Sequence, residues 1–422
     1  MRSNASAGER GVAHAAARSS DGRPGGRLLA AAILLAAANL RPAVASVGPV
    51  LEDIRFDLGL SGAAASVLTA LPLLCFGAGA LIAPRLARRF GSYNVLVVVL
   101  GTTTLGLVLR LGPGAITLFA GTFLAGAAIA VANVLIPALV KREFPARTGI
   151  MMGGYISVMV AGAAASAWVT VPAARAIGGL WRVGLGMWAV PAALGFALWL
   201  LLAVRRGRRR AADGRTAEVP ASMARDPVAW HVTVFLGLQS MGFYAVLGWL
   251  PSLYRSHGVS PTSAGQLLSL VIILGVPTAL VVPSLASRSA QQRGWAVGSV
   301  AVVALGMLGL LVAPLAAPYL WVSLLGLGFG VGFPLGLTLA VLRSRTAGDA
   351  AQLSAMSQSM GYALAATGPF VFGLLHDLSD GWTVPVGFLL VMLAPQAVAG
   401  LWAGRAVYVR GGRSPAGFGG ES

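Results

Sequence analysis

Residues 28–50 read LLAAAILLAAANLRPAVASVGPV, an apolar stretch that carries one charge, Arg41, near its middle. A helix needs about 20 apolar residues to cross the roughly 30 Å hydrocarbon core of a bilayer, so the stretch predicts a transmembrane helix. The tetrapeptide Asn39-Leu40-Arg41-Pro42 interrupts it. A guanidinium at that depth costs about 2.5–3.5 kcal/mol on insertion scales and must face protein, water or a ligand. Arg41 is therefore a candidate functional residue.

The rest of the chain repeats this apolar pattern. Of 422 residues, 57% are apolar and 10% are charged, whereas a soluble domain carries about 25% charged residues. Scanning about 19 residues at a time predicts twelve spans, at 28–50, 61–83, 93–111, 114–139, 147–171, 183–204, 228–253, 263–284, 294–313, 317–342, 352–375 and 383–404. We therefore expect an all-α integral membrane protein with twelve transmembrane helices in the lipid bilayer.

The basic residues indicate how the spans are oriented. Most of the 31 Lys and Arg fall before the first span and in every second connection, while the alternate connections hold only Arg55, Arg110, Arg175, Arg182 and Arg255. Cytoplasmic loops are enriched in Lys and Arg. The pattern predicts a multi-pass membrane protein with both termini in the cytoplasm. The net charge of +18 is thus an orientation signal, and we expect no nucleic-acid partner.

An internal repeat divides the chain. Leu58-Gly59-Leu60-Ser61 recurs as His257-Gly258-Val259-Ser260, Pro84-Arg85-Leu86-Ala87 matches Pro283-Ser284-Leu285-Ala286 at the same offset, and Gly154-Tyr155 matches Gly361-Tyr362. Parallel repeats of six spans are typical of two-bundle secondary transporters, which bind solute between the halves near the midplane. The sequence predicts cytoplasmic tails at 1–27 and 405–422, six-helix bundles at 28–204 and 228–404, and a basic linker at 205–227.

From about residue 28 to 405 this architecture resembles the major facilitator superfamily. That superfamily's landmark lies between spans two and three and ends in Leu-Ala-Asp-Arg-x-Gly. Here it reads Leu86-Ala87-Arg88-Arg89-Phe90-Gly91, so Arg88 stands where the Asp is usual. The resemblance implies a major facilitator fold and a gating loop formed by Arg88, Arg89 and Gly91.

Four strings give a narrower resemblance, to the cyanate and 2-nitroimidazole transporter (CynX/NimT-like) branch. They lie at residues 39–42, 71–77, 133–142 and 354–362 and read NLRP, LPLLCFG, NVLIPALVKR and SAMSQSMGY. The resemblance implies secondary active or facilitative transport of a cyanate-like anion or a nitroimidazole-like compound across the bacterial inner (plasma) membrane. Efflux of a drug or metabolite by the same fold stays open, as do the coupling ion and a membrane sensor that transports nothing.

Arg41 has three interpretations at this stage. It could line a central cavity and hold a small delocalised anion or a nitro group with its planar fork of donors. It could instead extend outward toward Glu52 at the membrane surface. It could also bond to backbone carbonyls at a helix break near Pro42.

Other polar residues at membrane depth are candidate ligands of the same solute. Ser240, next to Gln239, is the repeat partner of Arg41, and Tyr244 lies one helical turn further on. The predicted substrate-binding set is Arg41, Asn39, Asn133, Tyr155, Gln239, Ser240, Tyr244, Gln358 and Tyr362. Interhelical hydrogen bonding, worth about 0.6 kcal/mol per contact, is the alternative role for the amides.

The remaining reactive residues do not suggest an enzyme. Four His and one Cys, Cys75, are scattered, so no disulfide, no metal site and no cofactor is expected. No Asp or Glu lies near the middle of a predicted span, and no G-x-x-x-x-G-K-[ST] loop for ATP is present. We expect a monomer whose partner is a small-molecule substrate.

Overall fold

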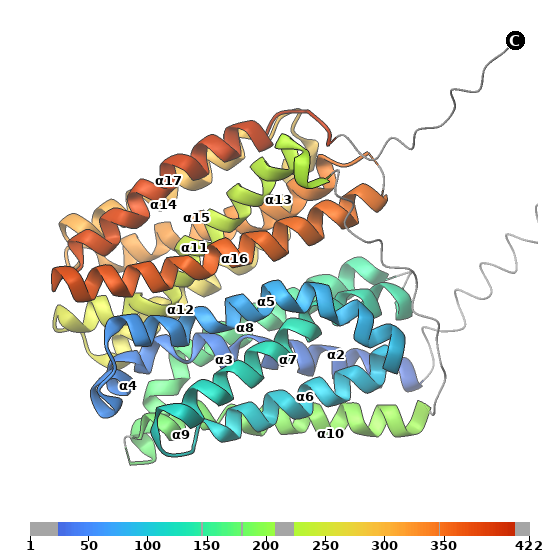
Figure 1. Ribbon diagram of the computed structural model, residues 1–422, viewed down its shortest axis with the longest axis horizontal. Helices are drawn as coiled ribbons and strands as arrows, with labels where there is room; N and C mark the ends of the chain where they lie inside the picture. The colour runs from blue at the N-terminus through green and yellow to red at the C-terminus, as the bar shows by residue number, and fades with distance from the viewer. Residues whose placement is uncertain (1–23, 145–146, 179, 207–222, 346, 410–422) are drawn as a thin grey trace, which may run out of the picture.

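The structure is a computed structural model of the chain, and it describes residues 24–144, 147–178, 180–206, 223–345 and 347–409. Most of both predicted tails and most of the predicted linker lie outside these ranges. The architecture is all-helical, with two bundles stacked as layers, one running from blue to green and the other from yellow to red in Figure 1.

The first bundle begins with a broken helix. Its elements are α2 (Pro24–Leu40), α3 (Pro42–Ala45), η1 (Gly48–Val50), α4 (Leu51–Leu58), α5 (Gly62–Phe90), α6 (Ser92–Leu109), α7 (Gly114–Glu143), α8 (Thr148–Ala176), α9 (Trp181–Gly186) and α10 (Ala189–Arg206). The first span therefore continues beyond the predicted end at Val50, as a helical run to Leu58.

The second bundle follows a short 3-10 turn. Its elements are η3 (Met223–Arg225), α11 (Pro227–Ser256), α12 (Pro261–Ile273), α13 (Gly275–Arg288), α14 (Arg293–Val312), α15 (Pro318–Leu342), α16 (Ala347–Ser379) and α17 (Thr383–Ala403). The end of the molecule that carries α4 and α9, at the left of Figure 1, is called the α4 end below.

Eleven helical segments within the described residues are long and apolar enough to cross a membrane. They cover all predicted spans except the one at 352–375. That span lies within α16, which is 33 residues long and runs beside the others in Figure 1. Polar residues such as Gln352, Ser354 and Gln358 explain why α16 is less apolar. It packs between α5 and α11, where these side chains are half-buried.

The repeated motif has a physical basis in the backbone. Gly59 and Gly258 both have positive φ, 61° and 85°, a conformation that favours glycine. The serine two residues later caps the next helix in each half. The Ser61 hydroxyl accepts from Ala64 N at 3.1 Å, and the Ser260 hydroxyl accepts from Ser263 N at 3.2 Å. The two halves thus enter α5 and α12 in the same way.

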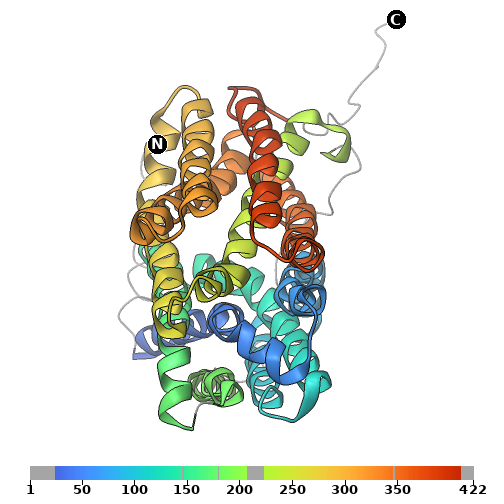
Figure 2. The same cartoon turned by 90° about the vertical axis from the view of Figure 1, so that its left-hand side faces the viewer.

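The two bundles meet along α5 and α16, and along α8 and α12. Figure 2 shows the same pairing from the side, with the blue and the orange-red helices in contact. Small residues allow close approach: a Cβ added at Gly77 would lie 3.1 Å from Ser359 O, and one at Gly265 would lie 2.6 Å from Ala167 O. The halves therefore pack backbone to backbone at these crossings.

Charged side chains join the halves at the α4 end. The Asp377 carboxylate accepts from the N–H groups of Gly62 and Ala63, both at 2.8 Å, at the start of α5. Arg55 lies 3.5 Å from the same carboxylate, and Arg255 donates to Asp53 at 2.7 Å. A carboxylate at a helix N-terminus is favoured by the helix dipole and by unpaired N–H groups. We call this cluster the α4-end junction.

Candidate functional site

A cavity of about 120 Å³ lies between the two halves near the middle of their helices. The first half contributes Arg41, the α3 segment and α8, and the second half contributes α11, α12, α13 and α15. The lining is almost entirely apolar, and its polar side chains are Arg41, Gln239, Ser240 and Tyr244. Concave, mostly apolar sites with a few convergent polar groups are the usual form of a small-molecule binding site.

Arg41 enters the cavity from the break in span one. Pro42 follows it and starts α3, and the N–H groups of Val44 and Ala45 both bond to Arg41 O, at 3.0 and 2.9 Å. Proline lacks an N–H and cannot continue the ladder of α2. The interruption is therefore encoded by the Arg-Pro step, and it directs the arginine side chain out of the first bundle.

Tyrosines surround the Arg41 guanidinium. Its Nη1 donates to the Tyr244 hydroxyl at 2.5 Å, across the interface between the halves. Tyr155 on α8 and Tyr362 on α16 are buried and also interact electrostatically with it. These two tyrosines come from the Gly-Tyr pair that repeats in the two halves. One cation is thus shared by phenol groups from both bundles.

The second half supplies an aromatic wall. Phe243 stands edge-on to Tyr244 and to Phe329, with ring centroids 5.4 and 5.8 Å apart. Phe329 and Phe333, one turn apart on α15, line the cavity with Phe243. Edge-to-face rings of this kind favour a flat apolar partner.

Neutral donors and acceptors lie beside this wall. The Gln239 amide donates to Phe329 O at 3.1 Å, and Ser240 donates to Gln239 Oε1 at 3.3 Å. Both side chains line the cavity and are buried. The cavity therefore has a cation from one half and uncharged polar groups from the other.

Five of the nine predicted ligand residues do not line the cavity: Tyr155 and Tyr362, which lie near Arg41, and Asn39, Asn133 and Gln358. Asn39 donates to Leu35 O at 2.7 Å and to Pro191 O at 3.0 Å, so its amide is directed between α2 and α10. Gln358 donates to the Ser354 hydroxyl at 2.9 Å, on its own helix. Asn133 is half-buried on α7, which packs against α5 and α6. The structure does not bring Asn39, Asn133 or Gln358 to the cavity wall.

The predicted gating loop joins α5 to α6. Gly91 has φ of 80°, and its N–H bonds to Ala87 O at 2.8 Å to end α5. Only glycine adopts this conformation readily. The Arg89 guanidinium lies 5.3 Å from the centre of the Phe90 ring. The side chain of Arg88 lies outside the described part of the structure.

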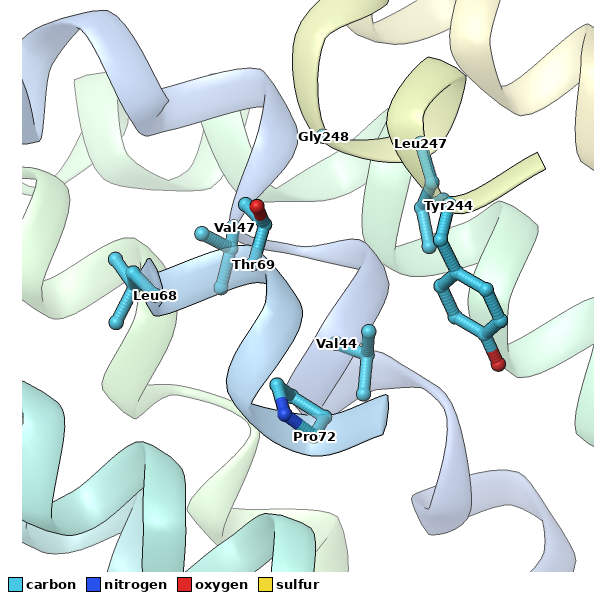
Figure 3. Close-up of a pocket in the computed structure, with 8 residues that line it drawn as sticks. All are labelled: Val44, Val47, Leu68, Thr69, Pro72, Tyr244, Leu247 and Gly248. Atoms are coloured by element: carbon cyan, nitrogen blue, oxygen red, sulfur yellow. The ribbon is translucent and has the colours of Figure 1, made fainter. Parts of the chain in front are cut away.

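A second cavity of about 10 Å³ lies toward the α4 end. Figure 3 shows the residues that line it. This volume is near the lower limit for one water molecule. Val44, Tyr244 and Leu247 line both cavities and form the wall between them. Val47 and Thr69 line only the small one. The central cavity is thus closed by packed side chains on this side.

The aromatic wall and Arg110 were missed in the sequence. Phe329 and Phe333 lie in a glycine-rich apolar span, and their i, i+4 spacing was the available signal. Arg110 was expected in a connection at the membrane surface. It is instead 1% exposed, and its Nη1 donates to Ala43 O at 2.7 Å. A hydropathy scan cannot show that an arginine at the end of a span turns inward.

Comparison with known proteins supports the same fold. The model of the Major Facilitator Superfamily matches residues 33–369. The "uncharacterized transporter YycB" of Bacillus subtilis is 39% identical, over 89% of this chain and 93% of its own length. The 2-nitroimidazole transporter of Escherichia coli is 36% identical, over 91% of this chain and 97% of its own length. The cyanate transport protein CynX of the same species is 30% identical, over 88% of this chain and 98% of its own length. The crystal structure of a D-xylose-proton symporter superposes with a TM-score of 0.72 at 15% identity, covering 90% of this chain and 97% of its own.

Proposed function

The chain belongs to the Major Facilitator Superfamily, and on that premise we propose that it transports a small planar solute with one nitro or anionic end by alternating access. It is a multi-pass membrane transporter and not an enzyme. The observation that carries the proposal is the position of Arg41. Its guanidinium reaches from a helix break in one half into an apolar cavity and bonds to Tyr244 of the other half.

The chemistry of the cavity supports a polar head and a flat body. A guanidinium offers a planar fork of donors that matches a carboxylate, a nitro group or another delocalised anion. Phe243, Phe329 and Phe333 suit the face or edge of a small ring. Gln239 and Ser240 could then bond to ring nitrogens or hydroxyls without adding a second charge. This asymmetry favours neutral nitro compounds and monoanions.

Size favours a ring over a triatomic anion. An engineered apolar cavity of about 150 Å³ binds benzene, and the cavity here is of similar magnitude, about 120 Å³. Cyanate would occupy only the Arg41 end and leave the aromatic wall without a partner. The similarity to the 2-nitroimidazole transporter agrees with a ring-shaped substrate. We therefore propose that a nitroheterocycle or a similarly sized aromatic anion is a better substrate than cyanate.

The arrangement of the halves suits a rocker-type mechanism. The solute site lies between the bundles, and the α4-end junction holds them together on one side of it. Opening that junction while the opposite end closes would expose the site to the other compartment. With the orientation that the basic residues predict, the α4 end faces outward. The cycle serves uptake or efflux, according to the gradient of the solute or of a coupled ion.

The first experiment measures binding to the purified protein. A ligand present at 100 times its dissociation constant should stabilise the fold by about 2.7 kcal/mol, so 2-nitroimidazole, benzoate and cyanate are compared in a thermal-shift assay. We expect 2-nitroimidazole and benzoate to stabilise more than cyanate. Uptake into proteoliposomes should follow the same order. An absence of binding and uptake for all three would contradict the proposal.

Substitutions at Arg41 test its role. Arg41→Lys should keep the fold and membrane level but lose most binding, because an ammonium cannot reproduce the planar fork. Arg41→Ala should also lose binding, and it should express at least as well as the parent because the cost of a charge in the membrane is removed. Arg175→Lys, at an exposed site that bonds to Thr262, is the matched control. Normal affinity in Arg41→Ala would exclude the guanidinium as a ligand.

A further inference from the structure

The break in span one leaves backbone carbonyls without helical partners. Because Pro42 has no N–H, the Ala38 carbonyl loses the donor that an uninterrupted helix would supply. Further on, the Val47 N–H bonds to Val44 O at 3.3 Å instead of reaching back to Ala43. Arg41 therefore sits between two segments whose relative direction is not set by helical hydrogen bonds.

Two side-chain hydrogen bonds connect these segments to other spans. On the later side, Arg110 donates from Nη1 to Ala43 O at 2.7 Å. On the earlier side, the Asn39 amide bonds to Pro191 O of α10 at 3.0 Å. Asn39 and Ala43 each lie two residues from Arg41. The break is thus tied on both sides to the rest of the first bundle.

The Arg110 guanidinium is buried around its contact with the Ala43 carbonyl. It is 1% exposed, and among the described residues its guanidinium has no carboxylate partner and its Nε has no hydrogen-bond partner. Its side chain passes α7 at Gly121, where an added Cβ would lie 3.1 Å from Arg110 Cγ. A buried charge is expensive unless it is well paired, so a role limited to filling space would be better served by an apolar residue.

We propose that Arg110 and Asn39 are positioning residues that hold the span-one break and so aim the Arg41 guanidinium across the cavity at Tyr244. Both act through the backbone, and neither touches the solute. The effect on ligand affinity rests on the proposed function. The clamp on the backbone does not, and it can be measured without any ligand.

Hydrogen–deuterium exchange tests the clamp directly. In Arg110→Met, the amides of residues 43–48 should exchange about tenfold faster than in the parent, because local opening governs exchange. The second break, between α12 and α13 at Leu274, is an internal reference that should not change. Arg175→Met, which removes an exposed arginine, is the control variant. Unchanged exchange at residues 43–48 in Arg110→Met would overturn the clamp.

Ligand affinity tests whether the clamp positions Arg41. With 2-nitroimidazole as the probe, Arg110→Met and Asn39→Leu should each weaken binding about tenfold, since small misplacements of a binding group are costly. Arg110→Lys should recover most of the affinity, because an ammonium can still donate to the Ala43 carbonyl. In an Arg41→Lys background, Arg110→Met should add little further loss. Full additivity, or no rescue by lysine, would mean that Arg110 is merely structural.

The exchange experiment and the affinity experiment test different claims, so one can fail while the other succeeds. If the parent protein does not bind 2-nitroimidazole, the proposed solute is wrong, while exchange at residues 43–48 still decides whether the clamp exists. If Arg110→Met does not fold, Asn39→Leu carries the same tests. Exchange that matches the parent in Asn39→Leu as well would leave the positioning role without support.

Discussion

Ser240 and Gln358 are both polar side chains at membrane depth, but only Ser240 faces the cavity. We expect Ser240→Ala to weaken 2-nitroimidazole binding by about 0.5–1.5 kcal/mol, the usual net worth of a hydrogen bond. Gln358→Ala should leave it unchanged, because that amide bonds to Ser354 on the same helix. Titration calorimetry on the two variants checks this. A larger loss in Gln358→Ala than in Ser240→Ala would mean that the solute lies nearer α16.

At the residue scale, depth and repeat position were the informative signals. Arg41 stood out because nothing else explains a charge within an apolar span. Ser240 and Gln239 followed from the repeat offset, and both line the cavity. Asn39 could not be judged in the same way, since the carbonyl that it meets belongs to Pro191, far away in the chain. Partners of that kind come from tertiary packing, which short sequence patterns do not encode.

At the scale of single helices, α15 shows how glycine sets helix spacing. A Cβ at Gly330 would lie 2.3 Å from Thr278 Oγ1 and 2.8 Å from Gly275 Cα on α13. Gly330→Ala should therefore destabilise the protein by about 1–3 kcal/mol through overpacking and narrow the cavity that Gly330 lines. Gly298→Ala on α14 is the control, because nothing lies within 4 Å of the added Cβ. Thermal unfolding of both variants gives the comparison, and equal melting temperatures would contradict it.

The helices themselves were largely predictable. Long apolar runs bounded by polar connections have few alternatives in a bilayer, since every backbone group must be bonded within the segment. The extension of the first span to Leu58 was not predicted, because Glu52, Asp53 and Asp57 made residues 51–58 look like a surface loop. In the structure two of these carboxylates pair with Arg255 and Arg182 of other elements. Such pairing offsets the polarity of α4.

At the scale of the whole molecule, the α4-end junction should set the balance between the two transport states. Asp377→Asn removes the charge that binds the start of α5 and Arg55, so the junction should open more often. Val47, which is 2% exposed behind the junction, reports on this as Val47→Cys in a Cys75→Ser background. We expect its labelling by a membrane-impermeant thiol reagent to become several-fold faster.

A neighbouring carboxylate supplies the control for that experiment. Asp380 is exposed and has φ of 47°, a conformation that asparagine tolerates, so Asp380→Asn removes a charge at the same end without touching the junction. In Asp380→Asn, the cysteine of Val47→Cys should be labelled at the same rate as in the parent. Equal labelling in Asp377→Asn and the parent would show that backbone packing alone keeps the α4 end closed.

Membrane orientation is a separate prediction at this scale. The alternation of Lys and Arg predicts that the linker and the carboxyl terminus both face the cytoplasm. Reporter fusions after Gly214 and after Ser422 should both report that compartment. A periplasmic signal from either one would reverse the direction assigned to the α4 end and to the junction.

The two-bundle architecture could be predicted from repeat motifs and span count, but the contacts between the bundles could not. Asp377 was expected in a loop, and its position on the first amides of α5 depends on how two distant helices cross. The outline of the binding site followed from Arg41. The aromatic wall of the site could not be predicted from the sequence and is seen only in the structure.

The unequal division of the cavity bears on how the two halves evolved. After a gene duplication both would have offered the same groups, whereas here one half contributes the cation and the other the rings and neutral polar groups. During transport, the nitro or anionic end of the solute would stay bound to the first half, while the second half moves relative to its planar face. A chimaera built from two copies of the first half would present two guanidinium groups to one cargo and would suit a dianion instead.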